Sequence, residues 1–515
     1  MKKSRTSNTI KNSAISLVTN LISMLIGVLG RWFFIKYLGK EILGLNGLFT
    51  NIISMLSIVE LGFGSAITYN LYKPIAKNDI NEIKSLMFFY KKCYHTIAIV
   101  IMIIGITLLP FLDSIIGENQ ISLNIYMIYG LFIFEAVSSY LLSYKRSILY
   151  ANQENFIINL CHIAYLILMN LLQIIFLIIT KNYYIYLIIK IIFRIIENIF
   201  ISHYANKKYS YLKDKQIERL PLNIKKDITK KVKALFFHQT GSFIINGTDN
   251  IIISKYINLT TVGLYSNYYF IINSIQNLIR QIIKEFTPSV GNLLVTETKE
   301  KAYDVFKKTR FLTFWIVTFT GTGILLVSSD FIKIWLGNEY TLPFLTILIL
   351  VINYYQKTSR MPYSIFKEAA GIFYEDRFIP IIESVINIIS SILLVKKIGL
   401  PGVFIGTIIS GLILWMYSYP IIVYKKIFNR EIKNYYLEII KYIALFLIII
   451  TISILLSKII IINNVYFKFF YDVGIAIIVP NLIMFMIFKN SEDYNYFLSI
   501  FKKIINKKFI NNREK

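Results

Sequence analysis

Long runs of apolar residues recur from one end of this 515-residue chain to the other. Many runs hold about 20 residues, enough for a helix to cross a hydrocarbon core of roughly 30 Å. Within such a core each lipid-facing backbone group needs a partner inside its own segment, which a helix provides. The alternating pattern of a membrane barrel is absent. We therefore predict an all-α polytopic membrane protein.

About fourteen transmembrane helices follow from these runs and the polar loops between them. Pro480 falls in the middle of the last predicted span and is expected to kink it, because proline has no amide hydrogen to donate. The expected spans lie near 12–37, 42–69, 93–112, 121–144, 156–180, 183–205, 234–254, 262–288, 311–328, 341–356, 378–395, 401–424, 434–457 and 465–488.

Positive charge collects on one side of this topology. Roughly 42 of the 56 Lys and Arg residues fall in the head, the tail and the alternate loops that share a side with them. The positive-inside rule therefore places both termini in the cytoplasm and explains most of the formal net charge of +27. Such loops attract anionic membrane lipids. Because they form no folded basic domain, we expect no nucleic-acid partner.

The first half of the chain is repeated in the second. Lys36-Tyr37 followed by Gly44-Leu45 returns as Lys255-Tyr256 followed by Gly263-Leu264, in each case 219 positions later. Each copy crosses the membrane an even number of times, so the repeat is parallel. The predicted organisation is two six-helix lobes related by this repeat, plus two C-terminal helices. Its parts are a first lobe over 1–210, a basic linker over 211–233, a second lobe over 234–430, the two extra spans over 431–490 and a basic tail over 491–515.

Polar residues form stripes along the first two spans of each copy. Spacings of three and four place each stripe on one helical face. Under the same displacement Ser23 corresponds to Ser242 and Ser54 to Asn273. The stripes either line a shared polar cavity or hold the helices together. Their members are Ser16, Asn20, Ser23, Gly27 and Arg31; Asn46, Thr50, Ser54, Ser57 and Glu60; His238, Ser242, Asn246 and Asp249; and Asn273, Gln276, Arg280 and Lys284.

Cations in the stripes favour the cavity. A cation in mid-span costs on the order of 3 kcal/mol, so Arg31, Arg280 and Lys284 are expected to face water, a counter-ion or a ligand. A further group, Lys190, Arg194 and Glu197, forms either an intrahelical ion-pair ladder or a substrate contact. Glu135 and Glu383 lack local partners, and we expect each to pair with a cation on another helix.

Two short motifs resemble a known family. The run Val59-Glu60-Leu61-Gly62-Phe63-Gly64-Ser65-Ala66 and the Lys36-Tyr37-Leu38-Gly39 stretch are similar to those of the Wzx-type polysaccharide transporters. These belong to the multidrug/oligosaccharidyl-lipid/polysaccharide exporter superfamily. The resemblance covers essentially the whole chain and includes the arrangement of six, six and two spans.

This resemblance implies a flippase of the bacterial cytoplasmic membrane, with no enzyme activity. Its cargo would be an undecaprenyl-diphosphate-linked oligosaccharide, carried to the outer leaflet by alternating access for capsule, O-antigen or exopolysaccharide synthesis. Arg31, Arg280 and Lys284 would hold the diphosphate, since guanidinium and ammonium groups suit phosphate. Glu60 and Asp249 are candidates for coupling to protons or sodium ions. Polymerases and glycosyltransferases of the pathway are the expected partners.

Other readings stay open. Tyr265, Tyr268 and Tyr269 either stack on sugars or form an interfacial aromatic belt. A lipid II flippase would use similar arginines, whereas a multidrug antiporter of the same superfamily would favour a carboxylate-rich cavity. A membrane glycosyltransferase or polymerase should carry a large loop with clustered carboxylates, which the sequence lacks. The four histidines show no metal-ligand spacing, so neither a metal nor a cofactor is expected.

Overall fold

The computed structural model describes residues 5–60, 63–117, 121–214, 218, 220–284, 286–372 and 375–499. Within these ranges the side chains of 5–17, 59, 63–67, 223, 227, 230, 231, 233–235, 237–239, 242, 243, 246 and 288 are not described. Every regular element in the described ranges is helical, which confirms the all-α prediction. The chain divides into two compact units, unit 1 with Met1–Asn267 and Arg377–Gly406, and unit 2 with Tyr268–Asp376 and Thr407–Lys515.

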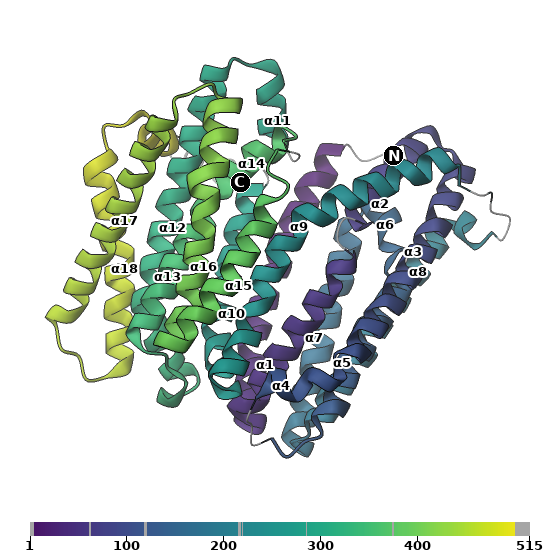
Figure 1. Cartoon of the computed structure of the whole chain (residues 1–515), viewed down its shortest axis with the longest axis horizontal. Helices are drawn as coiled ribbons and strands as arrows, with labels where there is room; N and C mark the ends of the chain where they lie inside the picture. Colours follow the sequence, from purple (N-terminus) through teal and green to yellow (C-terminus); the bar gives the residue numbers. More distant parts are fainter. Residues whose placement is uncertain are drawn as a thin grey trace, which may run out of the picture. The chain divides into compact units, whose positions relative to one another are not determined.

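Unit 1 is a helical bundle (Figure 1). In it α1 packs on α7 and on α9, and α9 also packs on α15. Helix α5 packs on α3 and on α8, and α8 also packs on α7. The elements of unit 1 are α1 (Arg5–Leu56), the 3₁₀ turn η1 (Ser57–Glu60), α2 (Phe63–Lys77), α3 (Ile80–Thr107), η2 (Leu109–Phe111), α4 (Leu112–Ile116), α5 (Ile125–Ser143), α6 (Arg146–Ala151), α7 (Asn155–Thr180), α8 (Tyr183–Lys208), η3 (Ser210–Lys213), α9 (Leu222–Tyr256) and α15 (Ile379–Ile398).

Unit 2 is built around α12, which packs on α13, α17 and α18 (Figure 1). Its elements are α11 (Thr287–Thr296), α12 (Lys299–Trp335), η4 (Asn338–Tyr340), α13 (Phe344–Ser359), α14 (Met361–Ala369), the π-helical turns η5 (Leu414–Ser418) and η6 (Pro420–Ile427), α17 (Ile432–Ile459) and α18 (Val465–Phe488). Two helices, α10 (Leu259–Lys284) and α16 (Leu400–Ile413), have residues in both units.

Nine helical segments of the described chain are long and apolar enough to cross a membrane. The first of these, Val18–Leu56, extends over parts of two predicted spans. Gly39, with φ 82° and ψ 177°, interrupts the helix and divides it into two parts. That backbone conformation suits glycine, which has no Cβ to clash. The break lies inside the loop that the sequence predicted between 37 and 42.

Several predicted boundaries are wrong. The span predicted over 42–69 ends its helix at Leu56, turns through η1 and resumes as α2, at the glycine-containing motif whose Leu61 and Gly62 lie outside the described residues. Helices α3, α9 and α12 begin at Ile80, Leu222 and Lys299, well before the apolar runs that predicted them. The apolar pattern marks only the part of a helix that lies in lipid, and a polar extension does not change it.

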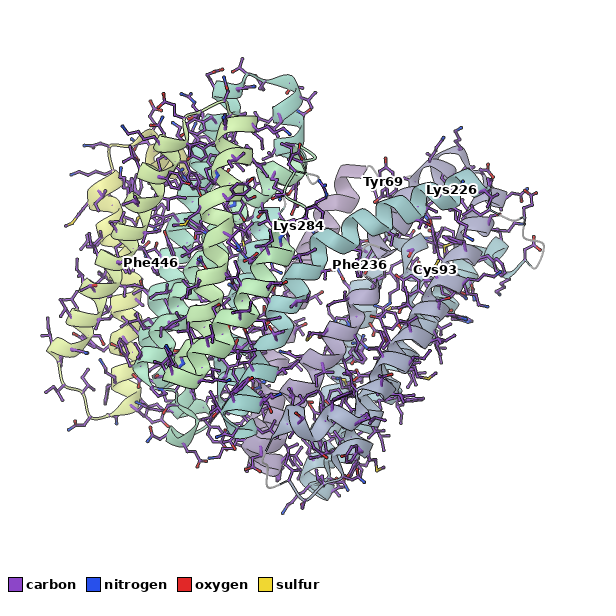
Figure 2. All side chains as sticks on the ribbon, in the orientation of Figure 1. Tyr69, Cys93, Lys226, Phe236, Lys284 and Phe446 are labelled. Carbon is purple, nitrogen blue, oxygen red and sulfur yellow. The ribbon has the colours of Figure 1, made fainter. Side chains whose placement is uncertain are left out.

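The predicted basic linker packs onto unit 1. Ile228 and Val232 on α9 are buried in the same apolar cluster as Ile83 and Leu86 on α3. Figure 2 shows Lys226 on α9 and Cys93 on α3 in the same part of unit 1. Of the predicted tail, residues 500–515 lie outside the described ranges.

The two copies of the repeated Lys-Tyr/Gly-Leu motif meet inside unit 1. A Cβ added at Gly44 would overlap the carbonyl oxygen of Leu259, and one added at Gly263 would overlap that of Lys40. The glycine Cβ positions are 3.2 and 3.3 Å from each other's backbone nitrogen. Gly44 and Gly263 are separated by 219 positions, and so are Lys40 and Leu259. The contact is therefore symmetric under the displacement found in the sequence.

Hydrogen bonds around this contact follow the same symmetry. Arg31 Nη1 donates to the carbonyl of Ser266 at 2.6 Å, and Asn250 Nδ2 donates to that of Gly47 at 3.4 Å. Arg31 corresponds to Asn250, and Gly47 to Ser266. Thr260 Oγ1 donates to Glu41 Oε1 at 3.4 Å, again a pair of corresponding positions. Close backbone approach through glycines, with polar groups across the contact, is how membrane helices associate.

Substitution of Gly44 by alanine tests this contact. Gly44→Ala forces backbone against backbone, so we expect the full-length protein to lose about 1–3 kcal/mol of stability and to melt at lower temperature in detergent. Gly130→Ala on α5 is the control, because its Cβ would meet no described atom within 4 Å and alanine favours a helix. Equal melting temperatures for the two variants would contradict the close approach.

Candidate functional site

A cavity of about 340 Å³ opens among the helices of unit 1. Its wall alternates hydroxyl, amide and charged side chains, which is unusual for the interior of a membrane bundle. It is lined from α1 and η1 by Thr50, Ile53, Ser54, Ser57 and Glu60; from α5 and α6 by Phe132, Glu135, Ala136, Ser139, Tyr140, Ser143 and Arg146; and from α8 by Lys190, Arg194 and Asn198.

One ion pair joins two helices across the wall of this cavity. Lys190 Nζ on α8 lies 2.8 Å from Glu135 Oε2 on α5. The ammonium group also lies 5.4 Å from the ring centroid of Phe132. The prediction that Glu135 pairs with a cation on another helix is confirmed. Both side chains are partly open to the cavity, with 26% and 15% exposure, so a ligand can reach the pair.

A second cluster surrounds Glu197, whose side chain is fully buried. Its carboxylate lies 2.6 Å from Arg194 Nη1, 3.4 Å from Arg146 Nη2 and 3.1 Å from His162 Nδ1. Arg146 also donates to Asn198 Oδ1 at 2.8 Å. Arg194 pairs with Glu197 within α8, as the intrahelical ion-pair ladder predicted. Lys190 instead pairs with Glu135 on another helix. One carboxylate thus serves two guanidinium groups that face the cavity.

Glu60 lies on the same wall with phenol partners. Tyr94 donates its hydroxyl hydrogen to Glu60 Oε1 at 3.2 Å, and Tyr140 is in hydrogen-bonding reach of Glu60 and Ser57. The coupling role of Glu60 stays a prediction.

The serines of the predicted second stripe reach the cavity. Ser54 and Ser57 line it, and each donates its hydroxyl hydrogen to the carbonyl one turn earlier, at 2.8 and 3.0 Å. Such bonding leaves the oxygen lone pairs toward the open space as acceptors for a sugar hydroxyl.

The first predicted stripe lies elsewhere in unit 1. Arg31 is half-buried, and both ends of its guanidinium bond Ser266, with Nη2 3.2 Å from the hydroxyl oxygen. Ser23 donates to the carbonyl of Thr19 at 2.7 Å, and Asn20 is half-buried. None of these three lines the cavity of unit 1. Asp249 is buried on α9, whereas the side chains of Ser242 and Asn246 lie outside the described residues.

The remaining predicted residues belong to unit 2. Asn273 and Gln276 are half-buried on α10, and Gln276 Nε2 donates to Thr358 Oγ1 at 3.0 Å. Arg280 and Lys284 follow one helical turn apart and are exposed (Lys284 in Figure 2). Within the described part of the chain neither forms an ion pair. The ligand contacts of these four residues stay predictions.

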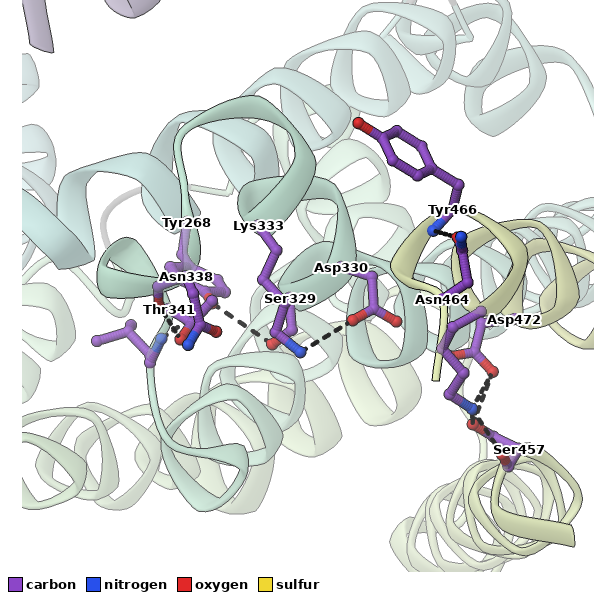
Figure 3. Close-up of polar contacts among 12 residues, drawn as sticks. Tyr268, Ser329, Asp330, Lys333, Asn338, Thr341, Ser457, Asn464, Tyr466 and Asp472 are labelled. Carbon is purple, nitrogen blue, oxygen red and sulfur yellow. Dashed lines mark hydrogen bonds and ion pairs between the residues drawn. The ribbon is translucent and has the colours of Figure 1, made fainter. Parts of the chain in front are cut away.

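Other charges in unit 2 are used in packing. Arg310, buried in α12, bonds Glu438 and Tyr424, and Lys367 bonds Asp376. Figure 3 shows two more local clusters, in which Asp330 pairs with Lys333 at 3.1 Å and Asp472 accepts from Ser457 at 2.6 Å. Pairs that are satisfied by neighbouring side chains in this way need no ligand to balance their charge.

The predicted aromatic group is divided by burial. Tyr268 is fully buried, where its oxygen accepts from the Leu342 amide at 3.0 Å and lies 3.5 Å from the Ser329 hydroxyl (Figure 3). Tyr265 is buried against Phe404. Neither ring can stack on a sugar, so that reading is wrong for both. Tyr269 is 41% exposed.

Comparison with known proteins identifies the family. Residues 36–344 match the family profile described as polysaccharide biosynthesis protein. The chain belongs to this family. No curated protein matches its sequence. The predicted kinship with Wzx-type polysaccharide transporters is thus confirmed at the level of the family.

Solved structures share the fold of this polysaccharide biosynthesis protein. It is similar to the lipid II flippase MurJ in an inward closed conformation, with a TM-score of 0.66, 16% identity and coverage of 93% of this chain and 99% of that one. It is similar to an inward-facing multidrug resistance MATE family transporter of the MOP superfamily, with a TM-score of 0.61, 15% identity and coverage of 79% and 96%. For the Vibrio cholerae MATE transporter VcmN the values are 0.54, 14%, 82% and 100%.

The family places the chain in polysaccharide biosynthesis, and the solved structures show that it has the multi-pass helical fold of these membrane transporters.

Sequence reasoning missed most of the cavity wall. Ser139, Ser143, Arg146 and Asn198 were not proposed as lining residues. The signal was present, because Glu135, Ser139, Ser143 and Arg146 follow spacings of four, four and three, the same criterion that found the other stripes.

Neutralising Glu197 tests the charge balance of the site. Glu197→Gln leaves Arg194 and Arg146 without their shared counter-ion, so we expect a loss of about 3–5 kcal/mol in stability of the full-length protein. Glu154→Gln is the control, since its partner Lys208 is 41% exposed and such a pair contributes about 0–1 kcal/mol. Chemical unfolding in detergent measures both. Equal losses would show that the buried carboxylate is not the central counter-ion.

Proposed function

We propose that this polysaccharide biosynthesis protein flips an undecaprenyl-diphosphate-linked oligosaccharide from the cytoplasmic to the outer leaflet by alternating access. The observation that carries the proposal is the polar cavity of unit 1, which opens inside a bundle of membrane helices and has cations, carboxylates and hydroxyls on one wall. Polar and charged groups inside a membrane bundle are costly unless they serve a ligand or one another, and a polar cargo would use this wall.

The chemistry of the wall suits a sugar. Ser54, Ser57 and Ser139 supply hydroxyl oxygens, and Lys190 and Arg194 supply N–H donors. Sugar hydroxyls both donate and accept, so they need partners of this mixed kind. An apolar drug would gain little here, which argues against a multidrug antiporter.

The diphosphate needs cations that can exchange a carboxylate for a phosphate. Lys190 and Arg194 face the cavity, and each is paired with a carboxylate, so their charges are balanced when the cavity is empty. When either pair opens, its cation can bind the phosphate. Arg280 and Lys284, exposed and without ion pairs in the described chain, are proposed as a second phosphate contact, and Arg31 as a third. A lipid II flippase presents the same diphosphate, and the oligosaccharide distinguishes the two cargoes.

The finer topology belongs to the same proposal. The nine apolar spans become fourteen when Val18–Leu56 is divided at Gly39 and when α8, α9, α10 and the shorter α13 are counted. Helices α8, α9 and α10 carry the charged and amide residues proposed for the transport path. These polar residues lower their mean hydropathy, so they are not among the nine segments that are apolar enough to cross a membrane. The excess of Lys and Arg on one side favours cytoplasmic termini. Two six-helix lobes and two C-terminal helices remain our proposal, supported by the sequence repeat at a displacement of 219 positions.

A flipping assay in proteoliposomes tests the function. The full-length protein is reconstituted with a fluorescent undecaprenyl-diphosphate oligosaccharide, and its appearance in the opposite leaflet is measured by quenching. We expect transport by the native chain and a loss of at least tenfold in Arg280→Gln/Lys284→Gln, since each charge-assisted phosphate contact contributes about 1.5–3 kcal/mol. Lys299→Gln, at the start of α12, is the matched control. Transport in the double variant at the control rate would refute the second phosphate contact.

A balanced substitution separates transport from packing in the cavity. Lys190→Gln/Glu135→Gln removes both charges of the interhelical pair together and leaves no uncompensated ion. We expect a melting temperature close to that of the native chain and at least a tenfold slower flipping rate. Native flipping in this variant would assign the pair to packing alone.

Ion coupling is tested by gradients. If Glu60 carries a coupling proton, Glu60→Gln should retain downhill flipping and lose its acceleration by an imposed pH gradient, because the amide cannot titrate. Asp249→Asn gives the parallel test for the second carboxylate, with a sodium gradient as the other arm. Flipping that is independent of both gradients in the native protein would exclude this coupling.

A further inference from the structure

A second, separate cavity of about 280 Å³ lies in unit 1 where α3, the turn between α5 and α6, and η3 come together. It shares no residue with the polar cavity, although the two are neighbours along the chain. Ser143 and Arg146 line the polar cavity, whereas Tyr144 and Lys145 between them line this one. Its wall consists of Lys84, Met87, Phe88, Lys91, Tyr144, Lys145, Leu212 and Asp214.

Three ammonium groups converge on this small space. Lys84 is only 11% exposed and pairs with Asp214 at 2.8 Å. Lys145 Nζ donates to Asn206 Oδ1 at 2.8 Å, an amide that supplies no charge. Among the described lining residues Asp214 is the one carboxylate, so two positive charges of the wall remain unbalanced.

The surroundings of Lys145 oppose its charge. Burial, and then the ammonium groups of Lys91 and Lys213, lower the pKa of Lys145. All three effects disfavour the charged form of Lys145. An anion in the cavity would offset the repulsion between Lys145 and the ammonium groups of Lys91 and Lys213. A topology signal requires only that lysines lie on one side of the membrane. It does not require them to face one another in a pocket.

We propose that this pocket, which we call the basic pocket, binds a phosphate group. Its volume falls near the lower end for ligand sites, which suits a single head group and not an oligosaccharide. Ammonium groups are strong point-charge ligands for phosphate. Met87, Phe88 and Leu212 supply apolar walls beside the lysines, which suits the glycerol end of a phospholipid. The same lysines would also take a soluble diphosphate.

Binding to the purified full-length protein tests the proposal with two probes. One is phosphatidylglycerol with a fluorophore on its acyl chain, compared with the matching phosphatidylcholine, and the other is inorganic pyrophosphate. We expect phosphatidylglycerol to bind more tightly than phosphatidylcholine. Each lysine near a phosphate is worth about a fivefold change in affinity, so Lys91→Gln should weaken binding about fivefold and Lys91→Gln/Lys145→Gln about 25-fold.

The matched control is Lys207→Gln/Lys299→Gln, which removes the same charge from exposed lysines outside the pocket wall. Its affinity should stay within twofold of the native value. The melting temperature of each variant is measured alongside, so that a loss of binding is distinguished from a loss of folding. Lys91 is exposed, and its single variant gives the same reading without touching a buried group.

The two probes distinguish the source of the phosphate. Lysine-dependent binding of phosphatidylglycerol alone assigns a lipid head group. Lysine-dependent binding of pyrophosphate alone assigns a soluble anion, and competition between the two assigns a shared phosphate site. Affinities in Lys91→Gln/Lys145→Gln that match those of the control variant for both probes would overturn the proposal. This outcome would not affect the proposed flippase function, which rests on a different cavity.

Discussion

The close approach of two glycines fixes the architecture of unit 1. Gly44 and Gly263 allow α1 and α10 to meet at their backbones, and the helix break at Gly39 lets the second part of α1 begin just before that contact. With that distance set, Arg31 reaches the Ser266 carbonyl and Asn250 reaches that of Gly47. Membrane helices gain little from the hydrophobic effect when they associate, so such short-range contacts carry the specificity.

Charge compensation is the second constraint, and it separates two kinds of polar residue. Arg310 with Glu438, and Lys367 with Asp376, are ion pairs within unit 2. Lys190 with Glu135 has the same chemistry but faces an open cavity. A buried pair adds little net stability over apolar packing, in unit 2 as well as at the cavity. What distinguishes Lys190 and Glu135 is that a ligand can reach them through the cavity.

Sequence patterns predicted the parts of the fold that depend on periodicity. Apolar runs located the membrane helices, and the Lys-Tyr/Gly-Leu repeat located a contact in which its two copies meet. They could not predict the polar extensions of α3, α9 and α12, because apolar runs record only the lipid-facing part. Glu135 was correctly expected to seek a partner on another helix, yet the partner could not be named, since pairing across helices depends on rotation about each helix axis.

The candidate site was predictable in kind and only partly in detail. Ser54, Ser57 and Glu60 were singled out by spacing, and all three line the cavity. Arg31 met the same criterion, but its guanidinium is engaged by Ser266, which a one-dimensional pattern cannot reveal. Arg146 was overlooked because it follows a turn, where a cation is normally read as a topology signal. The fold then brings it beside Asn198 and Glu197.

The central claim is that the polar cavity of unit 1 holds the cargo, and site-directed labelling tests it most directly. In a full-length chain whose Cys93 and Cys161 are replaced by serine, Ser54→Cys places a thiol on the cavity wall, and Thr296→Cys places one at the exposed end of α11, outside the spans. We predict that an undecaprenyl-diphosphate oligosaccharide slows maleimide labelling at position 54 at least fivefold and leaves position 296 unchanged. Equal labelling at position 54 with and without the cargo would contradict the account.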